Sequence, residues 1–484
     1  MRDIWGKFPF AFEFHIYMFN VTNPYGIESG EKPVVQEVGP FVYDKWHEKV
    51  NQIDEEDDDT VSYATKSMYY FNKDKSNGLS DEMEIVIPHF FIFALINAVH
   101  RDKPSALPVL SKAIDSIFGK PENLFIKTKV RNILFDGLLV DCNVQDFAGS
   151  AVCTQIKIYR ETLDIQLVGE NLYSASIVRP ANGTESKART RVHRGIKNIM
   201  DVGKVIEYNN NRNISVWDDE YCDTFNGTDG TVFHPHFDRK GRDDVVVFNP
   251  NLCRSISCHF ESKTTFSNMN LLRYTTDLGI DSENNPRQKC YCQPPNKCLK
   301  KGTFDTYKCN KSPIIVTNPH FFLADPYYKD LIDGMKPDKE KHMIIIDIDP
   351  FTGIPINVHT RAQLNILVNK VEKMKQLNNY REALLPIFWM DEVMIMPEYL
   401  LKEIKSGHTM VLLSKIFKYF VMLSGLGMCG FAGIKQYILR NKKKILNVMH
   451  AGEQKFNKNF NNAEMKTNIN TMSPAVATLP VNIH

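Results

Sequence analysis

Cysteine is the residue type with the most distinctive chemical potential in this 484-residue chain, and its positions are clustered. The cysteines that precede an apolar C-terminal segment are Cys142, Cys153, Cys222, Cys253, Cys258, Cys290, Cys292, Cys298 and Cys309. A zinc site usually takes its thiolates from two C-x2-C pairs, whereas Cys290 and Cys292 are separated by a single residue. We therefore expect disulfides, with no metal and no cofactor, and the spacing leaves their pairing open.

A second pattern is the N-glycosylation motif Asn-x-Ser/Thr, which recurs along the same part of the chain. Its acceptor asparagines are Asn20, Asn182, Asn213, Asn226 and Asn310. Like the clustered cysteines, all of them precede the apolar C-terminal segment. Disulfides and N-glycans are features of proteins that pass through the secretory pathway, so the two patterns together favour an extracellular domain.

Motifs that would support catalysis are missing from the sequence. It contains no G-x-S-x-G elbow, no H-E-x-x-H pair and no glycine-rich phosphate loop. His234 and His236 flank a proline without a third ligand at helical spacing, so we interpret them as loop residues. The net charge of +2 gives no overall attraction to nucleic acid. We expect a binding protein that is neither an enzyme nor a nucleic-acid binder.

Two apolar helices are expected in the N-terminal half, over residues 88–99 and 107–119. The first is too short and too interrupted to span a bilayer, and the second carries its apolar residues on one face. The side chains proposed to contact a ligand are Phe90, Phe91, Leu95, Leu110, Ile114, Ile117, Phe118, Lys120 and Lys127. If exposed, these helices would suit an amphiphile with a long chain and a polar or anionic head. Alternatively, they cap the core of a sheet, and the sequence favours neither interpretation.

Most of the remaining chain has the pattern of short strands. Apolar, β-branched segments alternate with Asn-, Gly- and Asp-rich turns between residues 130 and 360, which indicates an antiparallel sheet or barrel. The acidic block 54–59 cannot lie in a core, and we interpret it as a solvated hairpin tip.

The C-terminal part predicts a membrane anchor. Residues 409–434 are largely apolar and long enough for one transmembrane helix, and Lys435, Arg440 and Lys442 follow. The positive-inside rule then places residues 435–484 in the cytoplasm and residues 1–408 outside the cell. The first 14 residues lack the apolar core of a signal peptide, so we expect an N-terminal span or signal to have preceded Met1.

Several segments resemble the scavenger receptor class B family, which includes the fatty-acid translocase. They are Phe19-Asn-Val-Thr-Asn-Pro24, Val38-Gly-Pro-Phe-Val-Tyr43, Phe225-Asn-Gly-Thr-Asp-Gly230, Asn251-Leu-Cys-Arg-Ser-Ile256 and Pro319-His-Phe321. Within that family, Asp57–Tyr63 and Cys290–Cys309 are most similar to the insect sensory neuron membrane proteins. The resemblance implies an α+β fold: a large antiparallel β-barrel ectodomain with an apical helical bundle and a hydrophobic tunnel, held by a C-terminal transmembrane helix.

The resemblance also implies particular residue roles. The disulfides would be Cys222–Cys290, Cys253–Cys309 and Cys292–Cys298, which leaves Cys142 and Cys153 as an additional pair and Cys258 without a partner. The apical helices would be the ligand-binding element, and the basic position implicated in ligand capture falls at or near Lys120.

The function implied by the resemblance is capture of hydrophobic odorants without a chemical step. Fatty acids or fatty-acid-derived pheromones would pass through the tunnel to the membrane or to an odorant receptor, with odorant-binding proteins as further partners. The location would be the plasma membrane of sensory neuron dendrites. A general scavenger or lipid-uptake receptor, and a lysosomal receptor that escorts a protein, are the alternatives with the same fold.

Overall fold

The structure is a computed structural model of the whole chain. It describes residues 2–237, 244–278, 281–292, 298–371 and 373–464. The chain divides into two compact units, Met1–Leu401 and Lys402–His484. This division falls seven residues before the boundary expected at 408, so the first turn of the C-terminal helix packs with the first unit. The membrane boundaries at residues 409 and 434 remain predictions.

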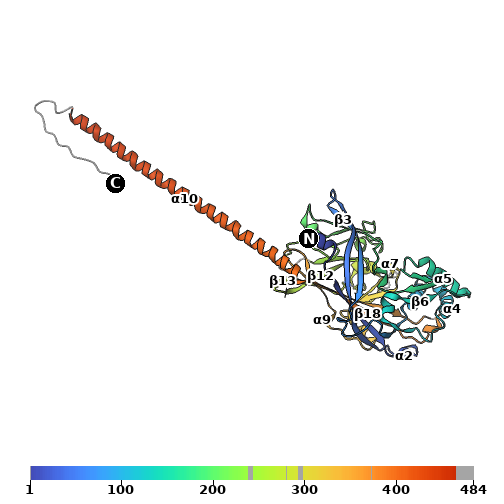
Figure 1. Cartoon of the computed structure of the whole chain (residues 1–484). Coiled ribbons are helices and arrows are strands. Elements are labelled where there is room, and N and C mark those ends of the chain that lie inside the picture. The colour runs from blue at the N-terminus through green and yellow to red at the C-terminus, as the bar shows by residue number, and fades with distance from the viewer. Residues whose placement is uncertain (1, 238–243, 279–280, 293–297, 372, 465–484) are drawn as a thin grey trace. The chain divides into compact units, whose positions relative to one another are not determined.

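A large antiparallel sheet dominates the first unit (Figure 1). Its strands are β1 (Phe12–Val21), β2 (Val35–Glu55), β3 (Thr60–Phe71), β9 (Thr190–His193), β10 (Val205–Tyr208), β11 (Val245–Asn249), β12 (Arg254–Phe266), β13 (Met269–Thr276), β14 (Thr303–Asp305), β15 (Ile314–Thr317), β16 (Ile344–Ile348), β17 (Pro355–Val368) and β18 (Ala383–Ile395). The main path runs β10-β9-β3-β2-β1-β18-β17-β16-β13-β12-β11, and β14 and β15 attach to β17. The acidic block lies at the tip of the β2–β3 hairpin, as predicted, although its last residue, Asp59, is buried and accepts from the Lys197 amide.

The two edge strands of this sheet are joined by residues 227–228. The amide of Val205 in β10 donates to the Gly227 carbonyl oxygen, and the amide of Thr228 donates to Val246 of β11, each at 3.0 Å. Gly227 has φ +79°, and a Cβ there would lie 2.0 Å from the Val246 carbonyl oxygen, so only glycine fits. The sheet is therefore nearly closed, which confirms the predicted barrel-like α+β fold.

Closure gives the sheet an inner face, and the alternation of side chains identifies it. Phe248 of β11 packs with Val61, Val192 and Val205 of β3, β9 and β10, which meet across the closure. On β3 the same face carries Tyr63 and the following odd-numbered residues. The strand register extends this inner face to these residues of the neighbouring strands: Tyr43, Lys45, His47, Lys49, Phe12, Phe14, Ile16, Met18, Phe388, Met390, Glu392, Val358, Thr360, Ala362 and Leu364.

The opposite face of β17 and β18 is polar and nevertheless buried. Arg361 is bonded to Asp391 at 3.0 Å, and its guanidinium also donates to the carbonyl oxygens of Glu340 and Met343. The amide of His320 donates to the Gln363 side chain. The segment 319–343 therefore covers this face of the sheet and satisfies its polar groups.

Two smaller sheets and several helices complete the first unit. The small strands are β4 (Glu84–Pro88) with β5 (Phe125–Lys129), and β6 (Leu138–Asp141), β7 (Gln166–Gly169) and β8 (Leu172–Ala175). The α-helices are α1 (Arg2–Gly6), α2 (Pro24–Glu28), α3 (Phe90–Asp102), α4 (Leu107–Ile117), α5 (Phe147–Tyr159), α6 (Glu220–Asp223), α7 (Tyr307–Asn310), α8 (Pro326–Asp330) and α9 (Lys339–His342). Short 3-10 or π turns are η1 (Pro104–Ala106), η2 (Asn132–Asp136), η3 (Arg179–Ala181), η4 (Ile199–Asp201), η5 (Pro286–Tyr291), η6 (Pro319–Phe321) and η7 (Lys375–Leu377).

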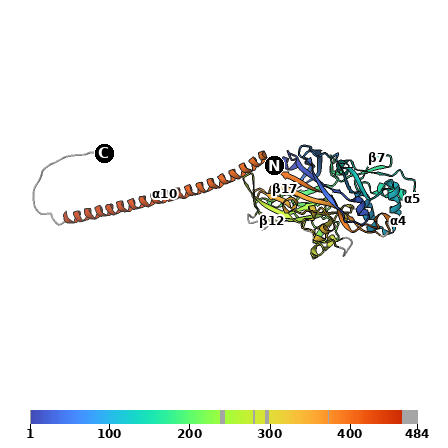
Figure 2. The same ribbon diagram turned by 90° about the horizontal axis from the view of Figure 1, so that it is seen from below.

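The barrel has two distinct ends. At the terminal end, the start of β1 pairs with the end of β18, through Glu13 and Val393, so both chain termini leave the barrel there. At the apical end, Asn97 of α3 donates to the Leu367 carbonyl oxygen near the end of β17. Helices α4 and α5 lie at this apical end, away from the N-terminus (Figure 2).

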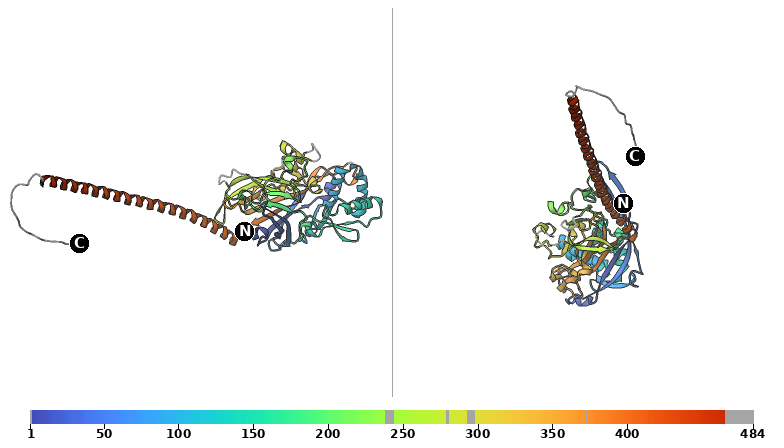
Figure 3. Two further views of the ribbon diagram at one scale, coloured as in Figure 1. Left: turned by 90° about the horizontal axis from the view of Figure 1, so that it is seen from above. Right: turned by 90° about the vertical axis from the view of Figure 1, so that its left-hand side faces the viewer.

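One long helix, α10 (Glu398–Glu464), runs without a break, and all of it after Leu401 belongs to the second unit (Figure 3). It is long and apolar enough to cross a membrane, and its apolar window is not buried against other residues. This agrees with the predicted transmembrane helix at 409–434. The helix continues to Glu464 through much of the expected cytoplasmic tail, whose residues 465–484 lie outside the described part of the chain.

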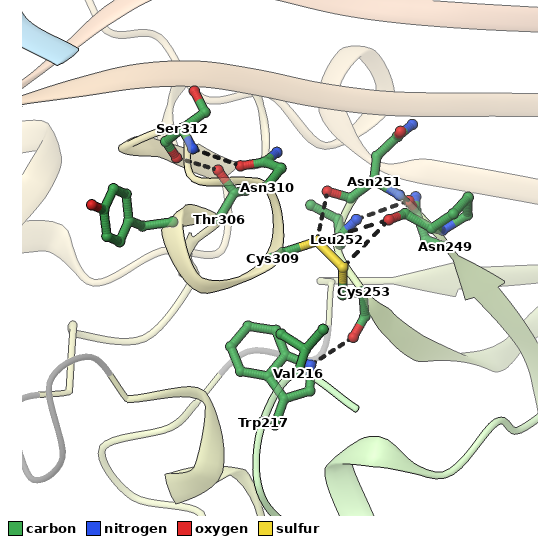
Figure 4. Close-up of a disulfide and its surroundings, with 12 residues drawn as sticks. Val216, Trp217, Asn249, Asn251, Leu252, Cys253, Thr306, Cys309, Asn310 and Ser312 are labelled. Carbon is green, nitrogen blue, oxygen red and sulfur yellow. Dashed lines mark hydrogen bonds between the residues drawn. A yellow bond between two sulfur atoms is a disulfide. The ribbon is translucent and has the colours of Figure 1, made fainter. Parts of the chain in front are cut away.

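Disulfides join the same cysteines that the resemblance pairs: Cys142–Cys153, Cys222–Cys290, Cys253–Cys309 and Cys292–Cys298. Figure 4 shows Cys253–Cys309, where the Trp217 indole donates to the Cys253 carbonyl oxygen at 2.6 Å. Cys258 is buried and unpaired. Each cross-link restricts the unfolded chain and stabilises the fold by roughly 2–4 kcal/mol.

Candidate ligand-binding interior

The apical helices bury the apolar residues that were expected to meet a ligand. His89 caps α3 by accepting from the Ile92 amide, and the apolar face of each helix turns into the core. The expected contact residues that are buried there are Phe90, Phe91, Leu110, Ile114 and Ile117, whereas Leu95 and Phe118 are half-buried. Most of the apolar surface of the two helices is therefore not exposed, and a contact of these residues with a ligand stays a prediction. The helices cap the core, because each has one apolar face and the core absorbs it.

The apical cations are exposed, as their charge requires. The Lys127 ammonium pairs with Glu84 at 3.1 Å, across the β4–β5 ladder. Lys120 follows α4 and has no ion-pair partner among the residues that the structure describes. Its charge is therefore available to a ligand, and its role in capture remains a prediction.

The expected glycosylation sites differ in accessibility. Asn213 and Asn226 are exposed in loops, and Asn310 is exposed at the end of α7. Asn20 and Asn182 are half-buried, and their side-chain oxygens accept from the amides of Val86 and Tyr69. Glycosylation at all of these positions remains a prediction, and the exposed three offer the freest access.

The inner face of the barrel is where apolar side chains retain accessible surface. The half-buried apolar residues on this face are Val358, Ala362, Leu364 and Met390. Thr360, on the same face, is exposed. Side chains that surround a filled core are normally buried almost completely. Other side chains of the inner face, such as Ile16, Met18 and Phe388, are fully buried, so the half-buried residues mark the part of this face that is a candidate ligand surface.

A charged pair stands on this inner face. The Lys45 ammonium of β2 contacts the Glu392 carboxylate of β18 at 2.8 Å, over the intervening strand β1. Burial by itself would lower the pKa of Lys45, but the Glu392 carboxylate outweighs it and the pKa is raised. Burial, followed by the nearby Lys45 charge, lowers the pKa of His47 to about 4. The Lys45 ammonium is therefore charged and His47 neutral at physiological pH, so the inner face carries polar groups beside its apolar ones.

A second charged pair lies toward the terminal end. The Lys49 ammonium contacts Asp229 at 2.7 Å, and the Tyr63 hydroxyl donates to the same carboxylate at 2.6 Å. Both charged side chains are almost completely buried. Burial lowers the pKa of Lys49 to about 8, although the Asp229 carboxylate opposes this shift. This pair anchors the closing segment 227–231 to β2.

Aromatic residues of the N-terminal segment pack against the inner face at the terminal end. The Trp5 ring lies 3.7 Å below the Lys49 ammonium and 5.3 Å from the Tyr63 ring. Phe8 packs on Phe12 at 4.9 Å and shares a small core with Met394. Residues 5–12 therefore close this end of the interior with aromatic side chains.

Sequence reasoning did not identify these interior residues. Lys45, His47 and Lys49 alternate along a strand, which is the usual pattern of a solvated face. Their acidic partners are far away in the sequence, at Asp229 and Glu392. The signal that could have revealed them is the aromatic residue Tyr43, which lies two positions before Lys45 and so shares its face of the strand. In the structure Tyr43 is buried.

Comparisons with known proteins match almost the whole length of this chain. The model of the CD36 family matches residues 1–436. The chain belongs to the CD36 family. This confirms the resemblance to scavenger receptor class B proteins that was based on short motifs.

Several relatives of this chain carry the name sensory neuron membrane protein 1. The protein of Apis mellifera is 40% identical over 445 residues, which is 92% of this chain and 85% of the relative. The protein of Ostrinia nubilalis is 37% identical over 91% of this chain and 83% of its own. That of Pediculus humanus subsp. corporis is 34% identical over 88% of this chain and 82% of its own. With the apolar helix α10, these matches identify a membrane-anchored receptor of the CD36 family.

Proposed function

We propose that this protein captures long-chain hydrophobic odorants, such as fatty-acid-derived pheromones, and passes them through the barrel interior to the membrane or to an adjacent odorant receptor. The observation that carries the proposal is the accessible apolar inner face around Ala362, Leu364 and Met390. Burial of each methylene there would contribute about 0.8 kcal/mol to ligand affinity. The names of the relatives support a location in sensory neurons, and the plasma membrane of their dendrites is part of the proposal.

The interior would conduct a ligand between the two barrel ends. The apolar side chains line this route, and the Lys45–Glu392 pair supplies polar groups for a head that passes it. The aromatic segment 5–12 would be the last barrier at the terminal end, where both chain termini emerge. No covalent change of the ligand is needed, which agrees with a receptor.

The test is ligand binding to residues 1–401, secreted behind an added signal peptide. A fluorescent long-chain fatty acid is titrated and then displaced with pheromone-like acids, esters and aldehydes. Ala362→Trp places a large ring on the inner face and should weaken binding at least about tenfold, or 1.4 kcal/mol. Leu167→Trp, at an exposed position of β7, is the matched control. Undiminished binding by the Ala362→Trp protein would contradict the interior route.

An escort receptor for a protein partner is the second candidate, because the apical end exposes apolar side chains. Phe147 of α5 is 82% exposed, and Leu139 of β6 and Ile158 of α5 are about 60% exposed. Exposed apolar groups gathered on neighbouring elements are typical of protein contacts. If residues 1–401 bind no lipid, and Phe147→Ser abolishes capture of a candidate partner, this second function is the better one.

A further inference from the structure

A cavity opens on the flank of the barrel, where β3 ends. Its volume is about 230 Å³. Tyr43 and Phe71 form the last rung of the β2–β3 ladder, and they line the cavity together with Tyr69 and Phe135. Beyond this rung β2 continues toward the apical end without β3 beside it. The cavity therefore occupies a gap in the barrel wall, away from the tip of α4 where Lys120 lies.

The cavity reaches the inner face of the barrel through Tyr69. The Tyr69 ring packs at 6.0 Å from Phe135 on the cavity side and at 5.3 Å from Phe14, which belongs to the inner face. The Lys45 ammonium lies 5.7 Å from the same ring. Tyr69 therefore contacts both the wall of the cavity and the residues of the inner face, including Lys45 of the charged pair.

The cavity wall carries the Arg179 guanidinium, which forms no ion pair within the described part of the chain, although the nearby Asp136 carboxylate opposes the lowering of the Arg179 pKa by burial. The Arg179 nitrogens donate to the carbonyl oxygens of Asp136 and Ser174 and to the Ser174 hydroxyl, all of which are neutral acceptors. Its buried Nε has no hydrogen-bond partner in the described part of the chain. Arg131, across the cavity, is by contrast paired with the Asp136 carboxylate at 3.1 Å. A guanidinium has five N–H donors, of which three are used in these bonds and the Nε is inaccessible, so Arg179 retains one donor for a ligand.

The remaining acidic group at the wall does not compete for Arg179. The Tyr43 hydroxyl donates to the Asp81 carboxylate at 3.4 Å, and burial raises the pKa of Asp81. Four aromatic rings beside one available donor match a long-chain molecule whose head is a carbonyl oxygen. Free acids, esters and aldehydes share this acceptor.

We propose that this cavity is a lateral entrance of the barrel, in which Arg179 binds the carbonyl head of a long-chain ligand while Tyr43, Tyr69, Phe71 and Phe135 hold the first part of its chain. This entrance rests on the proposed function, because it delivers ligand to the same interior. It differs from the apical capture that the resemblance implies, since Lys120 takes no part in it.

Photo-crosslinking of the full chain in lipid nanodiscs tests the proposal. The probes are a 16-carbon acid and its methyl ester, each with a diazirine next to the head, and a matching alkane without a carbonyl. Saturable labelling of the peptides that contain Tyr69 or Phe135 is expected with the acid and the ester but not with the alkane. Arg179→Gln should reduce that labelling about tenfold, as expected for one charge-assisted hydrogen bond. Arg160→Gln changes an exposed arginine that does not line the cavity and is the matched control.

The outcomes separate the entrance from the proposed function. Saturable labelling elsewhere in the first unit, with none at Tyr69 or Phe135, would overturn the lateral entrance and leave lipid binding intact. Equal labelling by the alkane would overturn the role of Arg179. Absence of saturable labelling throughout the chain would overturn both. The wild-type labelling pattern decides the question even where Arg179→Gln fails to fold.

Discussion

The apical helices and the barrel interior contain similar apolar residues and differ in how these are packed. Helices α3 and α4 bury theirs in the main core, where Ile114 has no accessible surface. On the inner face of the barrel, Ala362, Leu364 and Met390 remain half-buried and a charged pair stands beside them. A helix can turn its whole apolar face into a neighbour, whereas the side chains on the inner face of a nearly closed sheet are covered only where others meet them from across the barrel. The half-buried residues of the barrel are therefore the ligand surface that we propose.

The largest expected effect comes from the charged pair at the terminal end of the interior. Asp229→Asn keeps the shape of the side chain and leaves the Lys49 ammonium buried without a counter-charge. The free energy of unfolding should fall by about 3–5 kcal/mol. Urea unfolding of residues 1–401 measures this. The matched control is Asp218→Asn, whose carboxylate is 87% exposed in its pair with Lys308 and should cost less than about 1 kcal/mol. Equal losses in the two proteins would contradict the structural role of Asp229.

An apical core substitution separates stability from binding. Ile114→Ala removes a fully buried side chain of α4 and should lower the free energy of unfolding by about 2–5 kcal/mol. Ligand affinity should be unchanged at a temperature where the protein remains folded. The Ala362→Trp protein should show the reverse behaviour: its ligand affinity should fall, and its free energy of unfolding should be unchanged. The comparison fails if Ile114→Ala weakens binding by tenfold or more in folded protein, because α4 would then contribute directly to the ligand site.

Acidification should destabilise the apical end. Burial lowers the pKa of His89 to about 4, whereas an unfolded histidine titrates near 6.5. Between these values the unfolded chain binds a proton that the folded chain does not, so stability falls as the pH drops from 6.5 toward 4. This histidine alone contributes a loss of about 2 kcal/mol between pH 7 and 5.

The variant His89→Asn isolates that contribution. Asparagine still offers an acceptor to the Ile92 amide at the start of α3 and does not titrate. Thermal unfolding at pH 7 and 5 should show a smaller difference in Tm than in the wild type. Part of the difference in Tm between pH 7 and 5 should persist, because the pKa values of His47 and His342 are also lowered to about 4 by burial. If the variant and the wild type show the same difference in Tm between pH 7 and 5, His89 is not held neutral by burial.

The smallest effect is expected at the apical surface. Lys120→Glu should weaken the capture of anionic long-chain ligands about two- to fivefold, since exposed charge contacts contribute about 0.2–1 kcal/mol. Lys127→Glu is the matched control, because that ammonium is already paired with Glu84. Initial rates of fatty-acid binding at low salt measure both. Unchanged rates in the Lys120→Glu protein would remove the apical cation from the capture step.

Local patterns in the sequence predicted the secondary structure well. Most alternating segments became strands, although Gln155–Tyr159, whose alternation also predicted a strand, lies in helix α5. Pro88 and Gly119 bracket the apical helix pair as expected, and the apolar segment at 409–434 lies within one long helix. These features depend on neighbouring residues, whose spacing sets which side chains share a face. The disulfide pairs and the family came from ordered motifs along the chain, which are equally visible without a structure.

The ligand site could not be predicted in the same way, because it depends on register and closure. Lys45 meets Glu392, and Lys49 meets Asp229, only because β2 is placed two strands from β18 and beside the closing segment at Gly227. Whether an apolar residue is fully buried or only half-buried is likewise decided by what packs opposite to it. By itself, the sequence determined the elements, the anchor and the cross-links of this protein. The tertiary structure alone decided where apolar surface stays open, since that depends on contacts between residues hundreds of positions apart.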